Sequence, residues 1–150
     1  MKTAYFSLGC FWSPQLEFEK VEGVKKAEVG YCGGDDPNTT YEKVCSGSTN
    51  HAETVKVEYD EKLVSYEELV RFFFKIHDPT QLNKQGPDIG TQYRSEIFYA
   101  DESQRKIAEK IKNELNDKFK GKVVTKVSKE KLYQPAEEYH QYYLKRKNFI

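Results

Sequence analysis

The sequence has no long apolar run. None of its segments approaches the about 20 consecutive apolar residues that a membrane-spanning helix needs. The apolar stretch near the N-terminus is too short for the hydrophobic part of a secretion signal, because Gly9 and Cys10 interrupt it. We therefore expect a cytoplasmic protein without a membrane partner, in a reducing setting where cysteines are more often functional or free than paired in structural disulfides.

Several cofactor motifs are also missing. No CxxC pairs occur, so a zinc or other metal site is not expected, and neither a GxGxxG nor a Walker A sequence suggests a bound nucleotide. We therefore expect no bound cofactor. The 24 Lys and Arg residues balance the 24 Asp and Glu residues, so net charge gives no reason to expect nucleic acid as a partner.

The chain is rich in aromatic residues, with 11 Tyr and 9 Phe among 150 residues, and its length suits one catalytic domain over residues 1–150. Strands are expected at 3–8, 24–31, 51–59, 95–100 and 123–127, and helices at 13–20, 66–77, 102–119 and 135–144. This order predicts an α+β fold, a two-layer α/β sandwich with a mixed, mainly antiparallel sheet, a ferredoxin-like core and long functional loops.

Cys10 lies where the first expected strand meets the first expected helix, in the segment Gly9-Cys10-Phe11-Trp12. Free amide groups and the positive end of the helix dipole favour a thiolate at such a junction. The segment therefore has the layout of a nucleophile beside an apolar wall. A buried structural cysteine is the alternative, and Cys10 alone does not decide between them.

Glu53 stands on the apolar face of an alternating strand. Glu53 shares its side with Val55, Val57 and Tyr59. Burial there disfavours the charged carboxylate, which raises the pKa and suits a proton donor near neutral pH. Alternatively, the side chain reaches solvent at the strand end.

Two long stretches, residues 32–50 and 78–94, read as loops rich in turn-forming and polar residues. His77 and Asp78 stand at the start of the second loop. They could form a catalytic pair, although a histidine at a helix end is more often a capping group.

The chain resembles the A-type peptide methionine sulfoxide reductases in segments spread along nearly its whole length. These are Gly9-Cys10-Phe11-Trp12, Gly30-Tyr31-Cys32-Gly33-Gly34, Thr40-Tyr41-Glu42-Lys43-Val44-Cys45-Ser46-Gly47, His51-Ala52-Glu53, His77-Asp78-Pro79-Thr80-Gln81, Gln85-Gly86-Pro87-Asp88-Ile89-Gly90-Thr91-Gln92-Tyr93-Arg94-Ser95 and Ala136-Glu137-Glu138-Tyr139-His140-Gln141. The resemblance implies thiol-dependent reduction of methionine-S-sulfoxide, free and in proteins, to methionine through a sulfenic acid on the catalytic cysteine.

The resemblance also implies roles for individual residues. Cys10 matches the family's nucleophile and Glu53 its proton donor. The remaining matches bind substrate: Phe11 and Trp12 form the wall for the methyl group, and Tyr41, Asp88 and Tyr93 hydrogen-bond the sulfoxide oxygen.

The chain departs from the family pattern at positions that include those needed to reduce the oxidised catalytic cysteine. Ser13 replaces a usual Gly, and the C-terminal tail lacks the resolving cysteines that many members carry. Cys32 and Cys45 are the candidates for a resolving cysteine, beside direct reduction by an external thiol. Cys32 could equally be a small buried side chain, and Cys45 belongs to a segment that is normally not catalytic. If a disulfide forms, thioredoxin or a similar thiol donor is the expected reductant.

Two other functions compete with this interpretation. A thiol peroxidase or a glutaredoxin-like oxidoreductase would also use a low-pKa cysteine beside aromatic residues, although a CxxC motif is missing. A peptide-binding module would use the two long loops and keep Cys10 as a structural residue.

Overall fold

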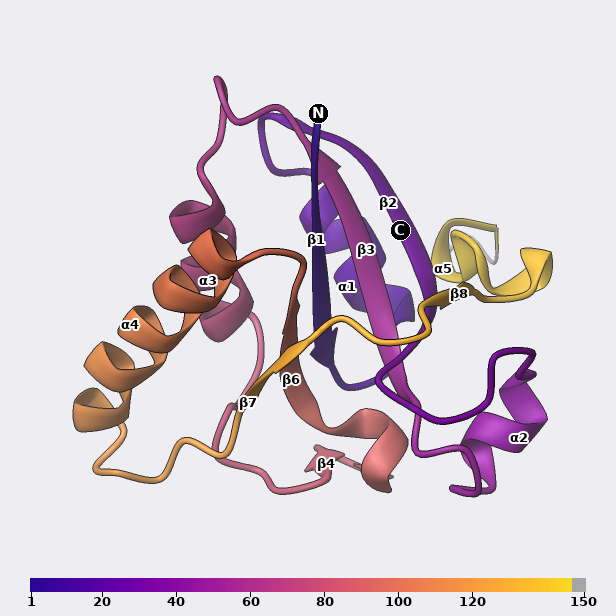
Figure 1. The fold of residues 1–150 in the computed structure, drawn as a ribbon. Helices are drawn as coiled ribbons and strands as arrows, with labels where there is room; N and C mark the ends of the chain where they lie inside the picture. The colour runs from indigo at the N-terminus through magenta and orange to yellow at the C-terminus, as the bar shows by residue number, and fades with distance from the viewer. Residues whose placement is uncertain (147–150) are drawn as a thin grey trace.

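The computed structural model describes residues 1–146, which fold around a six-stranded sheet in the order β7-β6-β1-β3-β2-β8 (Figure 1). Neighbouring strands run antiparallel except β6 and β7, which are parallel. The mixed, mainly antiparallel sheet of the sequence analysis is therefore confirmed. The strands are β1 (Lys2–Leu8), β2 (Val24–Cys32), β3 (Ala52–Tyr59), β6 (Ser95–Tyr99), β7 (Lys126–Lys129) and β8 (Gln134–Pro135), and β4 (Lys84–Gln85) pairs with β5 (Asp88–Ile89) in a separate hairpin.

Three helices pack on one face of the sheet. In Figure 1, α1 (Trp12–Glu19) lies behind the central strands, and α3 (Tyr66–Lys75) and α4 (Glu102–Lys118) stand together beside β6. Ser65 begins α3 with a complete capping box, and Asp101 caps α4 by accepting a hydrogen bond from Gln104, as their sequences predict. One aromatic-rich hydrophobic core joins the three helices to this face.

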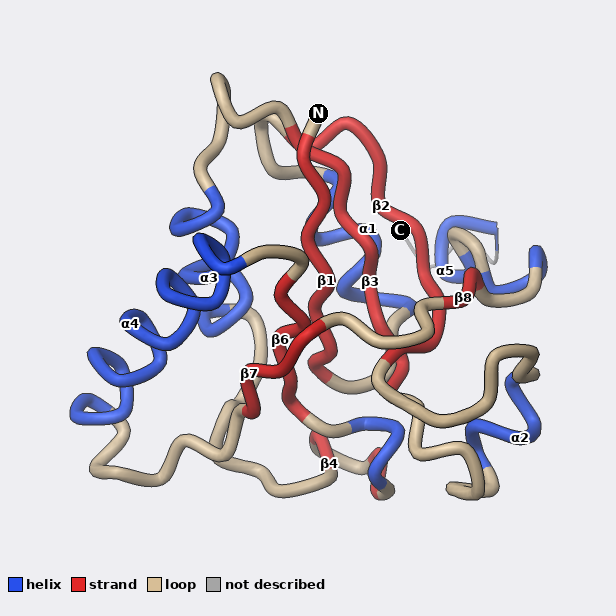
Figure 2. The backbone as a smooth tube through the Cα atoms, viewed as in Figure 1, coloured by secondary structure: helices blue, strands red, loops and turns tan. Residues whose placement is uncertain are grey.

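The opposite face is covered by chain without helices. The segment between β7 and β8 crosses the sheet from one edge strand to the other (Figure 2). Beneath it, a small second cluster contains Cys32, Ala52 and Phe98, with Tyr5 and Tyr133 packed against it. Each central strand therefore has one helix-covered face and one face covered by the C-terminal segment.

The expected helix over residues 135–144 is wrong. The segment instead contains β8, the 3-10 turn η2 (Glu138–His140) and the short helix α5 (Tyr143–Arg146). The cause is the Gln141 side chain, which accepts from the N–H of Val29 at 3.1 Å and donates to its carbonyl at 2.9 Å. This amide clamps the segment to the edge of β2, where a continuous helix could not follow it.

Other segments also differ from the sequence prediction, including the loop over residues 78–94, which contains β4 and β5. The loop over residues 32–50 contains the helix α2 (Tyr41–Cys45), and the strand expected at 123–127 is β7, three residues later. Thr40 caps α2 with its side chain. Within residues 1–146, no helix is long and apolar enough to cross a membrane.

Candidate active site

Cys10 lies at the strand-to-helix junction that the sequence predicts, between the end of β1 and the start of α1. Gly9 turns the backbone there with φ +104, which side-chain-bearing residues rarely adopt. A Cβ on Gly9 would lie 2.9 Å from the Cβ of Gln85. The loop that carries Gln85 therefore packs directly against the residue before Cys10.

Glu53 is buried on the helix-covered face of β3, with 1% of its surface exposed. Its Oε1 accepts a 3.2 Å hydrogen bond from the backbone N–H of Phe11, and its Oε2 has no partner among residues 1–146. Burial raises the pKa of Glu53 to about 8; the Phe11 N–H works against this shift and the charge of Asp88 adds to it. Glu53 is therefore a carboxylic acid at neutral pH, and the solvent-exposed alternative does not hold.

The free Cys10 thiol does not have the low pKa that its position at the helix start suggested. Burial raises the pKa of Cys10 to about 12, the charge of Glu53 adds to the rise, and the N–H of Trp12 opposes it. Loss of water around a thiolate thus outweighs the helix amides. Since Glu53 is itself protonated at neutral pH, the unliganded site holds a thiol beside a carboxylic acid.

Tyr41, Asp88 and Tyr93 converge on these two groups from three separate elements. Tyr41 begins α2, Asp88 begins β5, and Tyr93 ends the 3-10 helix η1 (Thr91–Tyr93). Burial raises the pKa of Tyr93 to about 12, with further contributions from the charges of Glu53, Cys45 and Asp88. Burial likewise raises the pKa of Tyr41, and contact with Cys45 and the charge of Glu53 add to it. Both phenols therefore keep their protons and can donate hydrogen bonds.

Phe11 and Trp12, the expected apolar wall, differ in exposure. Phe11 is 1% exposed and its ring packs on Tyr31, with centroids 5.9 Å apart, so most of it belongs to the core. Trp12 is partly exposed and stacks on Tyr143, with centroids 3.8 Å apart. Trp12 is therefore the more accessible of the two rings, and the backbone N–H of Phe11 binds Glu53.

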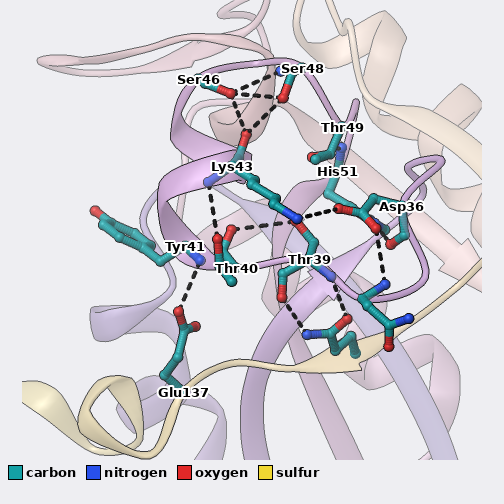
Figure 3. Close-up of polar contacts among 12 residues, drawn as sticks. Asp36, Thr39, Thr40, Tyr41, Lys43, Ser46, Ser48, Thr49, His51 and Glu137 are labelled. Carbon is teal, nitrogen blue, oxygen red and sulfur yellow. Dashed lines mark hydrogen bonds and ion pairs between the residues drawn. The ribbon is translucent and has the colours of Figure 1, made fainter.

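The C-terminal segment contributes polar anchors that sequence reasoning missed. Glu137 accepts hydrogen bonds from the hydroxyl of Tyr31 at 2.7 Å and from the N–H of Tyr41 at 3.0 Å. Figure 3 shows the Tyr41 nitrogen pointing to the Glu137 carboxylate. The indole N–H of Trp12 donates to Nδ1 of His140 at 3.1 Å. In the sequence, Glu137 and His140 stood out only as members of a family segment. Because that segment was expected to form a helix, their contacts with Tyr41 and Trp12 were not predicted.

Hydrogen bonds within the loop over residues 78–90 hold its shape near Cys10. Asp78 accepts hydrogen bonds from Thr80 and Gln81, and its backbone is paired at both ends by the side-chain amide of Gln85. A pocket of about 230 Å³ opens between this loop and α1. The residues lining it are Leu8, Cys10, Ser13, Pro14, Glu17, Ile76, His77, Gln85 and Asp88.

His77 anchors the end of α3. Its Nδ1 lies 2.6 Å from the carbonyl of Phe73 and its Nε2 lies 2.8 Å from the hydroxyl of Ser95. Burial lowers the pKa of His77 to about 4, so the ring is neutral and Nδ1 donates to the carbonyl. The capping role is therefore confirmed.

The sequence matches the family model described as Peptide methionine sulfoxide reductase over residues 2–149. The chain belongs to this family. A curated relative, Peptide methionine sulfoxide reductase MsrA of Pelagibacter ubique (strain HTCC1062), is 58% identical over 147 residues, which are 98% of this chain and 100% of the relative. The family resemblance found in the sequence is therefore confirmed, and this family member is an enzyme of the oxidoreductase class.

Solved structures agree with this reductase in fold. Mxr1 from Saccharomyces cerevisiae in reduced form matches it with a TM-score of 0.93 and 39% identity, covering 98% of this chain and 86% of Mxr1. Mxr1 in complex with Trx2 matches with a TM-score of 0.69 and 28% identity, covering 91% and 81%. The mixed α/β architecture is thus that of known methionine sulfoxide reductases.

The two other cysteines of this reductase lie in different surroundings. Cys32 is 0% exposed on the sheet face opposite Glu53, and its thiol donates to the carbonyl of Lys131 at 3.5 Å. Cys45 is partly exposed at the end of α2, its thiol contacts the phenol of Tyr41, and its charge raises the pKa of Cys10. The structure therefore brings Cys45, and not Cys32, to the predicted site residues.

Proposed function

We propose that this reductase converts methionine-S-sulfoxide, free and in proteins, to methionine, with Cys10 as the nucleophile and Glu53 as the proton donor. The observation that carries the proposal is the buried Glu53 carboxyl beside Cys10, with one oxygen bound by Phe11 and the other without a partner in the described part of the chain. A protonated carboxyl needs an acceptor for its O–H, and a sulfoxide oxygen is such an acceptor.

The first half-reaction transfers one oxygen atom. Glu53 gives its proton to the sulfoxide oxygen, the Cys10 thiol loses its proton to the resulting carboxylate, and the sulfur attacks the activated sulfoxide. An S–O bond forms on Cys10 while the S–O bond of the substrate breaks. The products are methionine and a Cys10 sulfenic acid, and Glu53 is again protonated. A thiol with a raised pKa suits this order of steps. Cys10 loses its proton only after a bound sulfoxide oxygen has taken the proton of Glu53.

The surrounding groups fit the two ends of a methyl sulfoxide. Tyr41 and Tyr93 keep their protons and donate to the oxygen, where negative charge develops, with Asp88 acting directly or through water. Trp12 and Phe11 line the side of the methyl group.

The second half-reaction removes the sulfenic oxygen as water. We assign the resolving role to Cys45, whose thiol displaces the hydroxyl of the Cys10 sulfenic acid and leaves a disulfide. This choice is supported by the shared surroundings of Cys10 and Cys45 and by the burial of Cys32 on the other face. A disulfide needs the two Cα atoms within about 7 Å, so this step requires Cys45 of α2 and Cys10 to lie within that distance.

Thioredoxin or a similar dithiol is the proposed final reductant, so the cycle needs thiols and no bound cofactor. The Mxr1–Trx2 complex supports this partner. Three free cysteines suit a compartment that keeps thiols reduced, which is the basis for proposing a cytoplasmic location.

The finer description of the fold is also a proposal. The order β6-β1-β3-β2, with helices α1 and α3 in the two crossovers, supports a ferredoxin-like core within one catalytic domain. Residues 33–50 and 78–94 carry Tyr41, Asp88 and Tyr93, which supports a functional role for both loops.

A substrate comparison tests the proposal. The wild-type enzyme should reduce the S epimer of methionine sulfoxide and leave the R epimer, with little turnover of hydrogen peroxide, and Cys10→Ser should abolish turnover. A peroxidase needs a ready thiolate, whereas burial raises the pKa of Cys10 to about 12. Faster turnover of peroxide than of sulfoxide, or activity retained in Cys10→Ser, would overturn the proposal.

A further inference from the structure

The two loops that carry the proposed oxygen-binding residues meet at one guanidinium group. Arg94 directly follows Tyr93, between the end of η1 and the start of β6. Its side chain is 12% exposed, and its Nε donates a 2.6 Å hydrogen bond to Oε1 of Glu96, whose side chain is 6% exposed. The charge of Arg94 is therefore paired within the fold, and its two terminal nitrogens remain for other acceptors.

The two terminal nitrogens of this guanidinium bind carbonyl groups of different loops. Nη1 donates to the carbonyl of Thr91 at 2.9 Å, within η1. Nη2 donates to the carbonyl of Asn50 at 2.9 Å, at the end of the loop over residues 33–50. Because the guanidinium and this second carbonyl belong to residues 44 positions apart in the sequence, the contact joins the loop that carries Tyr41 to the turn that carries Tyr93.

The beginning of the same loop also lies against the guanidinium. Gly33 follows β2 with φ +82, and a Cβ built on it would lie 3.1 Å from Nη2 of Arg94 and 2.5 Å from the ring of Phe98. The guanidinium thus lies where the first loop begins and ends. A second link between the two loops, from the side-chain amide of Gln92 to the carbonyl of Cys45, is 3.5 Å long and correspondingly weak.

We propose that Arg94 is a positioning residue, which holds the phenol of Tyr93 at the spacing from Tyr41 that lets both phenols bind one sulfoxide oxygen. The inference rests on the proposed function for the meaning of the two phenols. Two donors that act on one atom need a fixed spacing, because a displaced donor loses most of its hydrogen-bond energy. Tyr93 and Tyr41 stand on different loops, so their spacing depends on the contacts that join those loops.

Arg94→Lys separates the loop link from the buried charge. The guanidinium is a planar fork that donates in several fixed directions, whereas the Lys ammonium is a single point and does not reach all three acceptors at once. Lys keeps a positive charge near Glu96, so that carboxylate is not left buried without a cation. We expect kcat to fall about 10- to 100-fold with KM changed by less than about twofold, because the phenols act mainly on the charge that develops in the transition state.

A double-mutant cycle separates positioning from general damage to the enzyme. In Tyr93→Phe the phenol hydroxyl is already gone, so adding Arg94→Lys should lower kcat by less than about threefold more. Arg105→Lys is the matched control, since Arg105 also binds carboxylates, those of Glu102 and Glu109, but within α4, and kcat should stay unchanged. An unchanged kcat in Arg94→Lys, or an equally large fall with and without the Tyr93 hydroxyl, would overturn the inference.

Hydrogen exchange followed by mass spectrometry measures the loop link without substrate. In Arg94→Lys the amides of residues 46–51 and 90–94 should exchange about tenfold faster than in the wild type, while those of β1 stay unchanged. If this variant does not fold, Arg94→Gln combined with Glu96→Gln removes the link and the buried charge pair together and should give the same result. Unchanged exchange in both loops would contradict the inference. If the loops loosen but the wild type does not reduce sulfoxide, the proposed function fails while the loop link stands.

Discussion

The backbone N–H of Phe11 donates a 3.2 Å hydrogen bond to Oε1 of Glu53, which joins the residue after Cys10, the proposed nucleophile, to the proposed proton donor. This contact holds the carboxyl beside Cys10, while Oε2 has no hydrogen-bond partner among the residues that the structure describes. Because only one N–H stabilises the charged form, burial dominates and the pKa of Glu53 rises to about 8. The same contact thus positions the acid without preventing its protonation.

Replacing Glu53 by Gln should remove the proton donor and keep the hydrogen bond from Phe11. We expect kcat to fall by about 10²- to 10⁴-fold with KM little changed. Wild-type turnover should decline as the pH rises through about 8, where Glu53 loses its proton, and this limb should be missing in the variant. Steady-state kinetics between pH 6 and 10 measure both. An unchanged rate in Glu53→Gln would exclude Glu53 as the acid.

The free energy of unfolding should also depend on the protonation of Glu53. The folded-state pKa of Glu53 is raised from 4.5 to about 8, so in this window the native state binds a proton that the unfolded state has lost. The free energy of unfolding of the wild type relative to Glu53→Gln should therefore fall by about 1.4 kcal/mol per pH unit as the pH rises through it. Urea unfolding at several pH values tests this, and parallel curves for the two proteins would contradict it.

The Cys10 thiol should react slowly with alkylating agents in the unliganded enzyme. Burial first, and then the charge of Glu53, raise the pKa of Cys10 to about 12, so its alkylation rate should still be rising at pH 10. In Glu53→Gln the alkylation profile should shift to lower pH, because the carboxylate charge is gone. Peptide mapping of iodoacetamide adducts separates Cys10 from the other cysteines, and a plateau below pH 7 would refute the raised pKa.

Cys45→Ser should block disulfide formation after turnover, whereas Cys32→Ser should not. Cys45 lies with the site residues and Cys32 is buried on the other sheet face. We expect Cys45→Ser to lose most turnover with thioredoxin while still releasing methionine in a single turnover. Cys32→Ser is the control and should behave as the wild type. The reverse pattern would move the resolving role to Cys32.

Gly9→Ala should damage both stability and activity. Gly47→Ala is a matched control, since Gly47 also has a positive φ but no atom of the described residues lies within 4 Å of an added Cβ. The control should lose about 1–2 kcal/mol from backbone strain. Gly9→Ala should lose about 1–3 kcal/mol more from the clash with Gln85 and should lower kcat/KM by moving the loop that carries Asp88. Equal losses in the two variants would show that Gln85 does not hold that loop against Gly9.

The sequence was most informative where periodicity and capping decide local structure. Strand alternation placed Glu53 with Val55 and Val57 on one face, and Ser65 and Asp101 began the helices that they predict. The alternation of side chains along β2 could have been used in the same way. Continued by one residue beyond Tyr31, this alternation places Cys32 on the sheet face opposite the site.

The features that the sequence did not reveal depend on contacts between distant segments. The pKa of Cys10 depends on how much water the fold removes around it, which the helix start alone does not indicate. The segment around Gln141 has helical spacing, but its amide binds Val29, 112 residues away. The contact of His140 with Trp12 was not predicted for the same reason, because the two residues lie 128 positions apart in the sequence.

A single turnover is the most direct test of oxygen transfer from the sulfoxide to Cys10. A variant with Cys32 and Cys45 both changed to Ser keeps Cys10 as its only cysteine. It would be mixed with methionine-S-sulfoxide without reductant and followed by intact mass, peptide mapping and methionine release. We expect one methionine to be released per enzyme molecule, with a gain of one oxygen on Cys10. Methionine release with Cys10 unmodified would contradict it.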